Sequence, residues 1–304
     1  MVDASLLTHM LIGALLGLSV YLPLRCGQLS LATPGFYAIG GTLAALLSTR
    51  VSALGASDPT YPISSVLLEM LLAALLCGVL ATGIGAVVLR LRGVYLAIST
   101  IALVEILRVT TLNQESLGGA VGIFSIPQPF NEPSGYALFT LVLLAASCWL
   151  CDRLERNRLG RAMAAIRDDE LAAACQGIDT ERTKLVAFVL SAVVAGLVGV
   201  ISAHFLNSWN ARLGNFDASI TSLAFVVFGG SRTWAGPVLG GLVLTALPEL
   251  LRPIGDLRLI VFGLVILVGP LLLPQGLINP SLLAWLTMRL PGRNRAIRAS
   301  EGQP

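Results

Sequence analysis

DRLERNRLGRAMAAIRDDELAAACQGIDTERTK, residues 152–184, is a hydrophilic stretch that lies between long apolar runs. It holds seven of the twenty basic residues of the chain, which marks it as a charged loop. Within it, the acidic run 168–170 opens an alanine-rich segment, Leu171–Cys175, and Gly177 closes that segment. Acidic residues favour the N-terminus of a helix through its macrodipole, and a glycine suits the left-handed position that follows its end. The stretch therefore predicts a short helix at one membrane face, where it docks a partner protein.

The composition around this loop is that of a polytopic membrane protein. Apolar residues make up 55% of the 304 positions, and charged residues make up 12%, against about 25% in ordinary soluble proteins. Several apolar runs reach or approach the roughly 20 residues that a helix needs to cross a bilayer. We therefore expect an all-α membrane protein embedded in the lipid bilayer. Basic residues are spread over loop ends and do not cover one surface, so we expect no nucleic acid as a partner.

The chain divides into an expected permease domain, residues 1–288, and a basic, disordered tail, residues 289–304. Within the domain we count nine hydrophobic segments as transmembrane helices. They are residues 6–22, 35–49, 63–89, 93–112, 135–151, 185–207, 217–230, 236–251 and 257–274. Segments 35–49 and 217–230 are short enough to be re-entrant, since about 15 helical residues span only some 22 Å.

The distribution of Lys and Arg predicts which loops face the cytoplasm. Placing residues 152–184 inside and alternating outward in both directions puts fifteen of the twenty basic residues inside. This arrangement needs segment 217–230 to cross, because otherwise the basic tail would lie outside. We therefore expect nine crossings, with the N-terminus outside and the C-terminus inside.

Polar residues and helix-breaking residues occur together between the first two segments, in Gly27-Gln-Leu-Ser-Leu-Ala-Thr-Pro-Gly-Phe36. Irregular backbone at membrane depth persists only where protein buries it or where it lines a wet cavity. Two interpretations are equally open: a pathway lining or gate, and an ordinary interfacial loop. The candidates for the translocation pathway are Gln28, Ser30, Thr33, Ser99 and Thr100. The glycine-rich outer loop 117–127 likewise either lies close to a partner or forms a lid, or is a plain connector.

The sequence contains no nucleotide-binding loop of the GxxxxGK[ST] type, no HExxH and no GxSxG. Its two histidines, His9 and His204, lie in apolar segments, where each is expected to hydrogen-bond a neighbouring helix, and we expect no metal site. We therefore expect a transport subunit and not an enzyme.

Three acidic residues, Glu69, Glu105 and Glu249, fall inside or beside the apolar segments. Glu105 and Glu249 each have an arginine three positions later, on the same helix face, which predicts mutual neutralisation. Glu69 is expected to lie close enough to an outer end to stay hydrated. A functionally essential, unpaired member of this set is what an ion-coupled secondary transporter of small solutes, the alternative function, would require.

Several motifs, taken in order, resemble the membrane permease subunits of bacterial branched-chain amino-acid ABC importers, of the LivM-like type. The resemblance runs from about Gly27 to Arg252. It rests on the motifs Gly27-Gln-Leu-Ser-Leu, Leu91-Arg-Gly-Val-Tyr-Leu-Ala-Ile, Glu105-Ile-Leu-Arg, Gly118–Pro127, Gly160-Arg-Ala-x-x-Ala-Ile-Arg167, Gly177-Ile178 and Trp234-x-Gly-Pro-Val-Leu-Gly240.

The resemblance implies that residues 160–178 couple the permease to cytoplasmic ABC ATPase subunits. The coupling residues that it implies are Gly160, Arg161, Arg167, Glu170, Ala172, Ala173 and Gly177. It further implies a second homologous permease subunit, a periplasmic or extracytoplasmic solute-binding protein and a multi-pass location in the bacterial inner membrane. This chain would bind no cofactor itself, and the partner subunit would use the ATP.

One departure from the family pattern bears on the solute. After Gln-Leu-Ser-Leu the family usually shows Gly-His or Gly-Gln, whereas this chain has Ala32-Thr33-Pro34-Gly35. Related permeases are associated with urea, short amides and other small solutes. The sequence therefore leaves the choice open between a branched-chain amino acid and a related small polar solute.

Overall fold

The structure is a computed structural model that describes residues 4–50, 61–255, 257–272 and 276–277. The tail expected at residues 289–304 lies outside the described residues. The α-helices are α1 (Ala4–Leu24), α2 (Thr33–Arg50), α3 (Ile63–Val88), α4 (Val94–Asn113), α5 (Pro133–Arg156), α6 (Arg158–Asp168), α7 (Glu170–Cys175), α8 (Thr180–Leu206), α9 (Phe216–Gly229), α10 (Ala235–Leu250) and α11 (Leu257–Leu272). Two short strands, β1 (Ile123–Phe124) and β2 (Ser208–Trp209), pair antiparallel.

The all-α prediction is confirmed, and each of the nine predicted segments corresponds to a helix in the described part of the chain. Five of these helices, α1, α3, α4, α5 and α8, are long and apolar enough to cross a membrane by length and composition. Helices α9, α10 and α11 are apolar but shorter, with 14, 16 and 16 residues. The number of crossings, nine, therefore stays a prediction.

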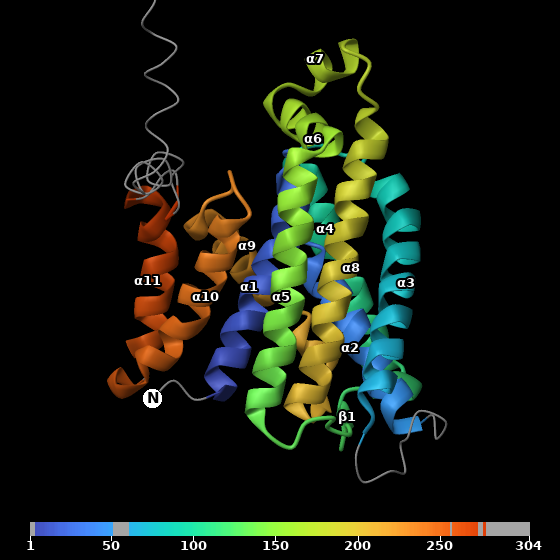
Figure 1. The fold of residues 1–304 in the computed structure, drawn as a ribbon, viewed down its shortest axis with the longest axis vertical. Coiled ribbons are helices and arrows are strands. Elements are labelled where there is room, and N and C mark those ends of the chain that lie inside the picture. Colours follow the sequence, from blue (N-terminus) through green and yellow to red (C-terminus); the bar gives the residue numbers. More distant parts are fainter. Residues whose placement is uncertain (1–3, 51–60, 256, 273–275, 278–304) are drawn as a thin grey trace, which may run out of the picture.

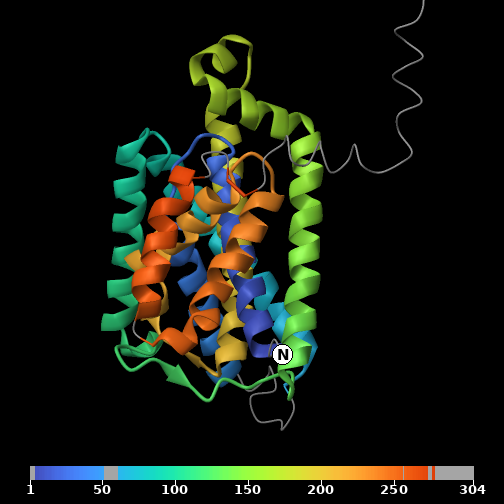
Figure 2. The ribbon, with the colours of Figure 1, turned by 90° about the vertical axis from the view of Figure 1, so that its left-hand side faces the viewer.

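The helices form an upright bundle with different elements at its two ends (Figure 1). Helices α6 and α7 cover one end, while β1 and the start of α1 lie at the other. Helix α3 stands on one flank and α11 on the opposite flank, and a quarter turn shows α4 and α5 at the two edges (Figure 2). Helices α1 and α8 are the most buried of the long helices, and their apolar side chains form the centre of the core with α2.

Close backbone contacts hold this core together at glycines. A Cβ atom added to Gly40 of α2 would lie 2.1 Å from the carbonyl oxygen of Gly196 in α8. One added to Gly240 of α10 would lie 2.0 Å from the carbonyl oxygen of Phe225 in α9. Neither distance can accommodate a side chain, so these glycines are required for helices to approach at backbone distance, as small residues do in membrane bundles.

Three connections meet at the end of the bundle that carries α6 and α7. Arg25, just after α1, donates from Nη1 to the carbonyl oxygen of Arg232 in the α9–α10 turn at 2.9 Å. The backbone N–H of Leu277, beyond α11, donates to the carbonyl oxygen of Phe228 at 3.0 Å. The loops to which the charge bias assigns the cytoplasm therefore share one end, which we call the coupling end.

Two helices begin inside the bundle and not at its ends. Residues 28–32 enter from the coupling end without helical structure, and α2 starts only at Thr33. Helix α9 has 14 residues, about 21 Å of helix, and runs from Phe216 to the coupling end. Their N-termini meet in the interior, because Ser219 in the first turn of α9 hydrogen-bonds Leu31 just before α2.

Candidate functional site

The short helix expected in residues 152–184 is present as α7, and its ends are capped as the sequence predicts. The Asp169 side chain accepts hydrogen bonds from the backbone N–H groups of Leu171 and Ala172 at 2.9 and 3.0 Å. Gly177 adopts φ +83°, the left-handed conformation that favours glycine, and closes the helix. Local sequence signals therefore sufficed for this element.

Helix α6 precedes it and was not anticipated. Its sequence carries the signal: Leu159, Met163 and Ile166 recur at intervals of four and three residues, which is typical of one buried helix face. Met163 and Ile166 are buried against the bundle in the structure. The coupling segment, which we define as residues 158–178, therefore consists of two helices lying across the end of the bundle.

The residues implied for coupling fall into three groups. Arg161, Ala172 and Gly177 are exposed on the outer surface of the coupling segment. Gly160 and Ala173 are buried, and a Cβ at Gly160 would lie 2.1 Å from the carbonyl oxygen of Leu154. Gly160 therefore allows α6 to pack on the end of α5. The remaining two, Arg167 and Glu170, point toward the bundle.

Glu170 connects α7 to two other parts of the chain. Its Oε1 lies 2.5 Å from Nζ of Lys184 in the first turns of α8. The same oxygen lies 3.3 Å from Nη2 of Arg92, in the turn between α3 and α4. Lys184 is buried and Glu170 is largely shielded, so this ion pair is less screened than one on an open surface. Movement of α7 would therefore be transmitted to α8 and to the start of α4.

A second set of contacts joins the coupling end to α1 and to the α9–α10 turn. Arg167 donates to the carbonyl oxygen and the hydroxyl of Ser231 at 3.1 and 3.2 Å. Glu155, near the end of α5, accepts from the Tyr21 hydroxyl at 2.6 Å and from the Trp234 backbone N–H at 3.1 Å. Sequence reasoning missed Glu155, because nothing in its local pattern separates it from a solvated loop acid.

Gln28 lies beneath the coupling segment, apart from the other pathway candidates. It lines a pocket of about 120 Å³ together with Arg167, Glu170 and Lys184. Neither polar atom of its buried amide has a hydrogen-bond partner among the described residues. Next to it, burial raises the pKa of the Cys26 thiol to about 12, against the opposing effect of the nearby cations Lys184 and Arg25. This is a tightly enclosed junction with little access to water.

The other pathway candidates lie in the bundle interior, where α2 and α9 begin. The backbone N–H of Leu31 donates to Oγ1 of Thr100 at 3.0 Å, and the Ser219 hydroxyl donates to the carbonyl oxygen of Leu31 at 3.2 Å. The hydroxyls of Thr33 and Ser191 lie 3.5 Å apart. Ser30 is buried beside them, whereas Ser99 is half-buried on α4. We call Ser30, Thr33, Thr100, Ser191 and Ser219 the polar seam.

Residues 30–33 are buried within the protein, which favours a pathway lining or gate over an ordinary interfacial loop. Among the described residues, Leu31 finds partners for both its N–H and its carbonyl group, which makes an irregular backbone tolerable at this depth. Two helix N-termini also lie in the same region, and the positive ends of their helix dipoles point into it. A pathway role for the seam stays a prediction.

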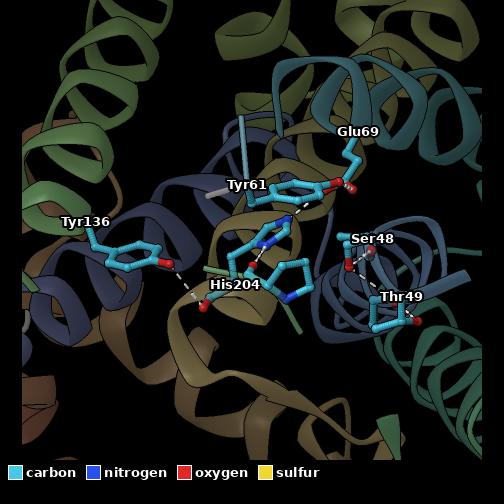
Figure 3. A network of polar contacts seen from close by, with 9 residues as sticks. Ser48, Thr49, Tyr61, Glu69, Tyr136 and His204 are labelled. Atoms are coloured by element: carbon cyan, nitrogen blue, oxygen red, sulfur yellow. Dashed lines mark hydrogen bonds and ion pairs between the residues drawn. The ribbon is translucent and has the colours of Figure 1, made fainter. Parts of the chain in front are cut away.

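Glu69 is fully buried, so the expectation that it stays hydrated is wrong. Its carboxylate contacts the Tyr61 hydroxyl and lies 2.6 Å from Nε2 of His204 on α8 (Figure 3). Nδ1 of His204 in turn lies 2.8 Å from the carbonyl oxygen of Pro127. A carbonyl can only accept, so Nδ1 carries a proton, and one further proton is shared between Nε2 and the carboxylate.

The outer loop that contains Pro127 is bound to the end of α8. Strands β1 and β2 pair in the register Ile123 to Trp209 and Phe124 to Ser208, and the Ile126 N–H donates to the Asn207 carbonyl oxygen at 3.3 Å. Together with His204, these contacts hold the loop across the end of the bundle opposite the coupling end. His204 thus bonds a neighbouring helix as expected, whereas His9 bonds the Ser5 carbonyl within its own helix.

The other two acidic residues are paired as the sequence predicts. Arg108 bonds Glu105 with two nitrogens, one of them at 2.9 Å, and Arg252 lies 3.0 Å from Glu249. The first pair is partly exposed on α4, about 16 Å along the helix from its start. In the part of the chain that the structure describes, no three His, Cys, Asp or Glu side chains gather as metal ligands would.

The model of the family described as branched-chain amino acid transport system / permease component matches residues 3–269. The chain belongs to this permease family. That match spans almost all of the helical bundle and confirms the resemblance and the transport function that the sequence motifs predict.

Individual members of the permease family agree with this assignment. The high-affinity branched-chain amino acid transport system permease protein LivM of Escherichia coli K12 is 34% identical over 307 residues, which cover 91% of this chain and 69% of the relative. The permease LivH of the same system and organism is 32% identical over 36% of this chain and 35% of its own length. The ribose import permease RbsC of E. coli K12 is 30% identical over 49% of this chain and 48% of its own. No solved structure matches the chain.

Proposed function

We propose that this chain is the membrane subunit of an ATP-driven importer in a bacterial inner membrane, coupled to a separate ATPase through residues 160–178. The observation that carries the coupling role is the ion-pair junction of Glu170 with Lys184 and Arg92. It gives a helix lying across the end of the bundle a direct mechanical connection to two of the spans. The chain has no nucleotide-binding motif, so the energy has to arrive through a bound partner.

The roles within the coupling segment divide between docking and transmission. Leu171, Ala172 and Arg161 are exposed and form the proposed docking face for the ATPase. Glu170 and Arg167 face the bundle and are proposed to transmit the movement, through Lys184 to α8 and through Ser231 to the α9–α10 turn. An ATPase drives this movement of the coupling segment only if its two states bind the docking face with different free energies.

The pathway is proposed to run along the exposed face of α4 and α9. This face carries the Glu105–Arg108 pair at membrane depth, and Asp217 is exposed in the first turn of α9. Ionisable side chains at such depth usually face a wet cavity or another protein and not lipid. A second homologous permease subunit, placed against this face, would complete the pathway with the polar seam as its gate.

The proposed solute is a branched-chain amino acid or a related small polar solute. The N-termini of α2 and α9 converge at the polar seam, and helix N-termini in discontinuous transporter helices favour anionic groups of the substrate such as a carboxylate. The hydroxyls of Thr33, Ser191 and Ser219 offer further hydrogen bonds. An extracytoplasmic binding protein is proposed to deliver the solute to this chain.

The alternative, an ion-coupled secondary transporter, finds no specific support in the described residues. Glu69, Glu105 and Glu249 each have a basic or imidazole partner, so none is the unpaired membrane acid that the alternative requires.

Co-purification and uptake test the proposal together. Wild type and a variant in which Arg161–Gly177 is replaced by a Gly/Ser linker are purified from native membranes in mild detergent, with Arg153→Gln as the control. We expect an ATPase to accompany wild type and the control but not the linker variant, and solute uptake to be lost with it. A wild-type protein that purifies alone and transports without ATP would refute the ATP-driven mechanism.

A further inference from the structure

The interface between α3 and α8, which we call the α3–α8 seam and which is distinct from the polar seam, contains two hollows. None of the roles above uses them. The hollow nearer the coupling end has a volume of about 230 Å³; its walls are formed by Gly85 of α3, Leu89 just after α3 and Leu185 of α8. The second, about 400 Å³, is shallow and open to the outside; it lies farther along α3 and is lined by Gly78, Gly83 and Val189 of α8. Leu185 and Val189 are one turn apart on α8, so the two hollows follow one line along the seam.

The second hollow lies beside two glycines of α3, Gly78 and Gly83, where a larger side chain would fit. A Cβ added to Gly83 would meet nothing within 4 Å, and one added to Gly78 would meet only a methyl group of Val193 at 3.7 Å. Neither glycine adopts a positive φ. Backbone conformation and close helix packing therefore do not require glycine at these two positions, and the space beside them is open.

The surroundings of the seam identify its environment as lipid. The outward side of α3 exposes Leu71, Leu75 and Val79 and has no charged residue between Glu69 and the end of the helix. The α4–α9 face, in contrast, carries exposed charges at membrane depth. An apolar helix face without charge lies against acyl chains, so an acyl chain is the natural occupant of a groove that opens on it.

The mouth of the groove, at the coupling end, is lined by Arg90, Glu181 and Arg182. Arg90 is exposed and has no ion-pair partner among the described residues, whereas Arg182 lies 3.0 Å from Asp179. Helix α3 has 26 residues, or about 39 Å, so its end reaches the headgroup level of a bilayer about 30 Å thick in its hydrocarbon core. Arg90, Glu181 and the Arg182–Asp179 pair therefore stand where a lipid headgroup lies.

We propose that the α3–α8 seam is a binding site for an amine-bearing phospholipid of the cytoplasmic leaflet, such as phosphatidylethanolamine. One acyl chain occupies the two hollows, the phosphate accepts hydrogen bonds from Arg90 and Arg182, and the headgroup ammonium donates to Glu181. Guanidinium groups suit phosphate oxygens because they present paired donors. A lipid with an anionic headgroup would bring no cation to Glu181, and a choline headgroup would bring no N–H donor. This site is independent of the proposed ATP-driven function, because it requires only the membrane position of α3 and α8.

Native mass spectrometry of the purified protein, after exchange into mixed micelles of phosphatidylethanolamine, phosphatidylglycerol and phosphatidylcholine, tests the site. We expect wild type to retain one phosphatidylethanolamine in preference to the other two. Arg90→Gln with Arg182→Gln should lower that retention about tenfold, since a charge-assisted hydrogen bond contributes enough for a tenfold change in binding. Gly83→Leu should lower it similarly by filling the groove, and Glu181→Gln should remove the preference for the amine headgroup while lipid is still retained.

Two matched controls show whether lipid retention falls because the α3–α8 seam is changed or because any glycine or arginine is replaced. Gly263→Leu on α11 changes a second helical glycine at which an added Cβ meets nothing within 4 Å, and Arg153→Gln removes an exposed arginine at the same end of the bundle on α5. Both should retain lipid as wild type does. Equal retention by the seam variants and these controls would overturn the proposal. So would a cross-link from a cysteine placed at Gly83 to a second permease chain, because that chain would then occupy the groove.

Discussion

Lys184 Nζ lies 2.5 Å from Glu170 Oε1, and this contact joins the short helix α7 to the long helix α8. Arg92 approaches the same carboxylate oxygen from the α3–α4 turn at 3.3 Å. A residue that the family resemblance implies as a contact to the ATPase is therefore engaged within its own chain. Its position supports the proposed transmission role, whereas Leu171 and Ala172 of the proposed docking face are exposed.

Glu170→Gln should separate these two roles. The amide cannot form the ion pairs with Lys184 and Arg92, so we expect uptake to fall at least tenfold while the ATPase still co-purifies. Exchange of the charges in Glu170→Lys with Lys184→Glu should recover much of the uptake. Arg156→Gln, which breaks the exposed pair with Asp152, is the control and should transport normally. Loss of the ATPase from Glu170→Gln would instead assign this residue to docking.

Thr100→Val should weaken the bundle at the polar seam. The substitution preserves shape but leaves the buried N–H of Leu31 without its acceptor, a loss of about 1–3 kcal/mol. We expect a lower unfolding temperature in detergent and altered uptake, both restored by Thr100→Ser. Thr110→Val is the matched control, because its exposed hydroxyl bonds only the Ile106 carbonyl of the same helix. Equal destabilisation by the two valine variants would show that the hydrogen bond in the polar seam does not stabilise the bundle.

Glu69 and His204 should behave as one unit in stability measurements. Removal of either partner leaves the other buried without its main contact, so Glu69→Leu and His204→Leu should each cost about 3–5 kcal/mol. The double variant should cost less than the sum of the two. Glu249→Leu breaks a more exposed pair and should shift the unfolding temperature little. Additive effects in the double variant would show that the two side chains do not interact.

The cysteines should differ in reactivity toward maleimide. The thiolate is the reactive form, and burial raises the pKa of Cys26 to about 12, so little thiolate forms at pH 7.5 or at pH 9. Cys175 is exposed on α7 and should be labelled first, which intact-mass measurement would detect. A Cys175→Ser variant should remain unlabelled at Cys26 over the same period. Rapid labelling of Cys26 in the folded variant would contradict the enclosed junction.

Local features of the chain were predictable because their causes lie within a few residues. The caps of α7 follow from Asp169 and Gly177, and the Glu105–Arg108 and Glu249–Arg252 pairs follow from a spacing of three on a helix. Helix α6 had a readable signal in Leu159, Met163 and Ile166 and was missed because the charged residues around them dominate the stretch.

The partners of Glu69 show the limit of this approach. Tyr61 precedes it by 8 residues across the start of α3, and His204 follows it by 135. Position in the sequence placed Glu69 near the outer end of a span, where water is expected. His204 of α8 and Tyr61 instead cover the carboxylate, and only packing of the bundle brings them there.

The amino-acid sequence by itself determined the apolar helical segments, the charged loop that joins two of them and the end of the bundle at which the basic residues gather. Hydrophobic run length, capping chemistry and charge are properties of short stretches, so they can be read without a fold. The tertiary structure alone decided that Leu31 meets Thr100, 69 residues away, and Ser219, 188 residues away. It also turned Glu170 inward. Such contacts depend on which helix faces pack together, and the packing of each face depends on all the helices of the bundle.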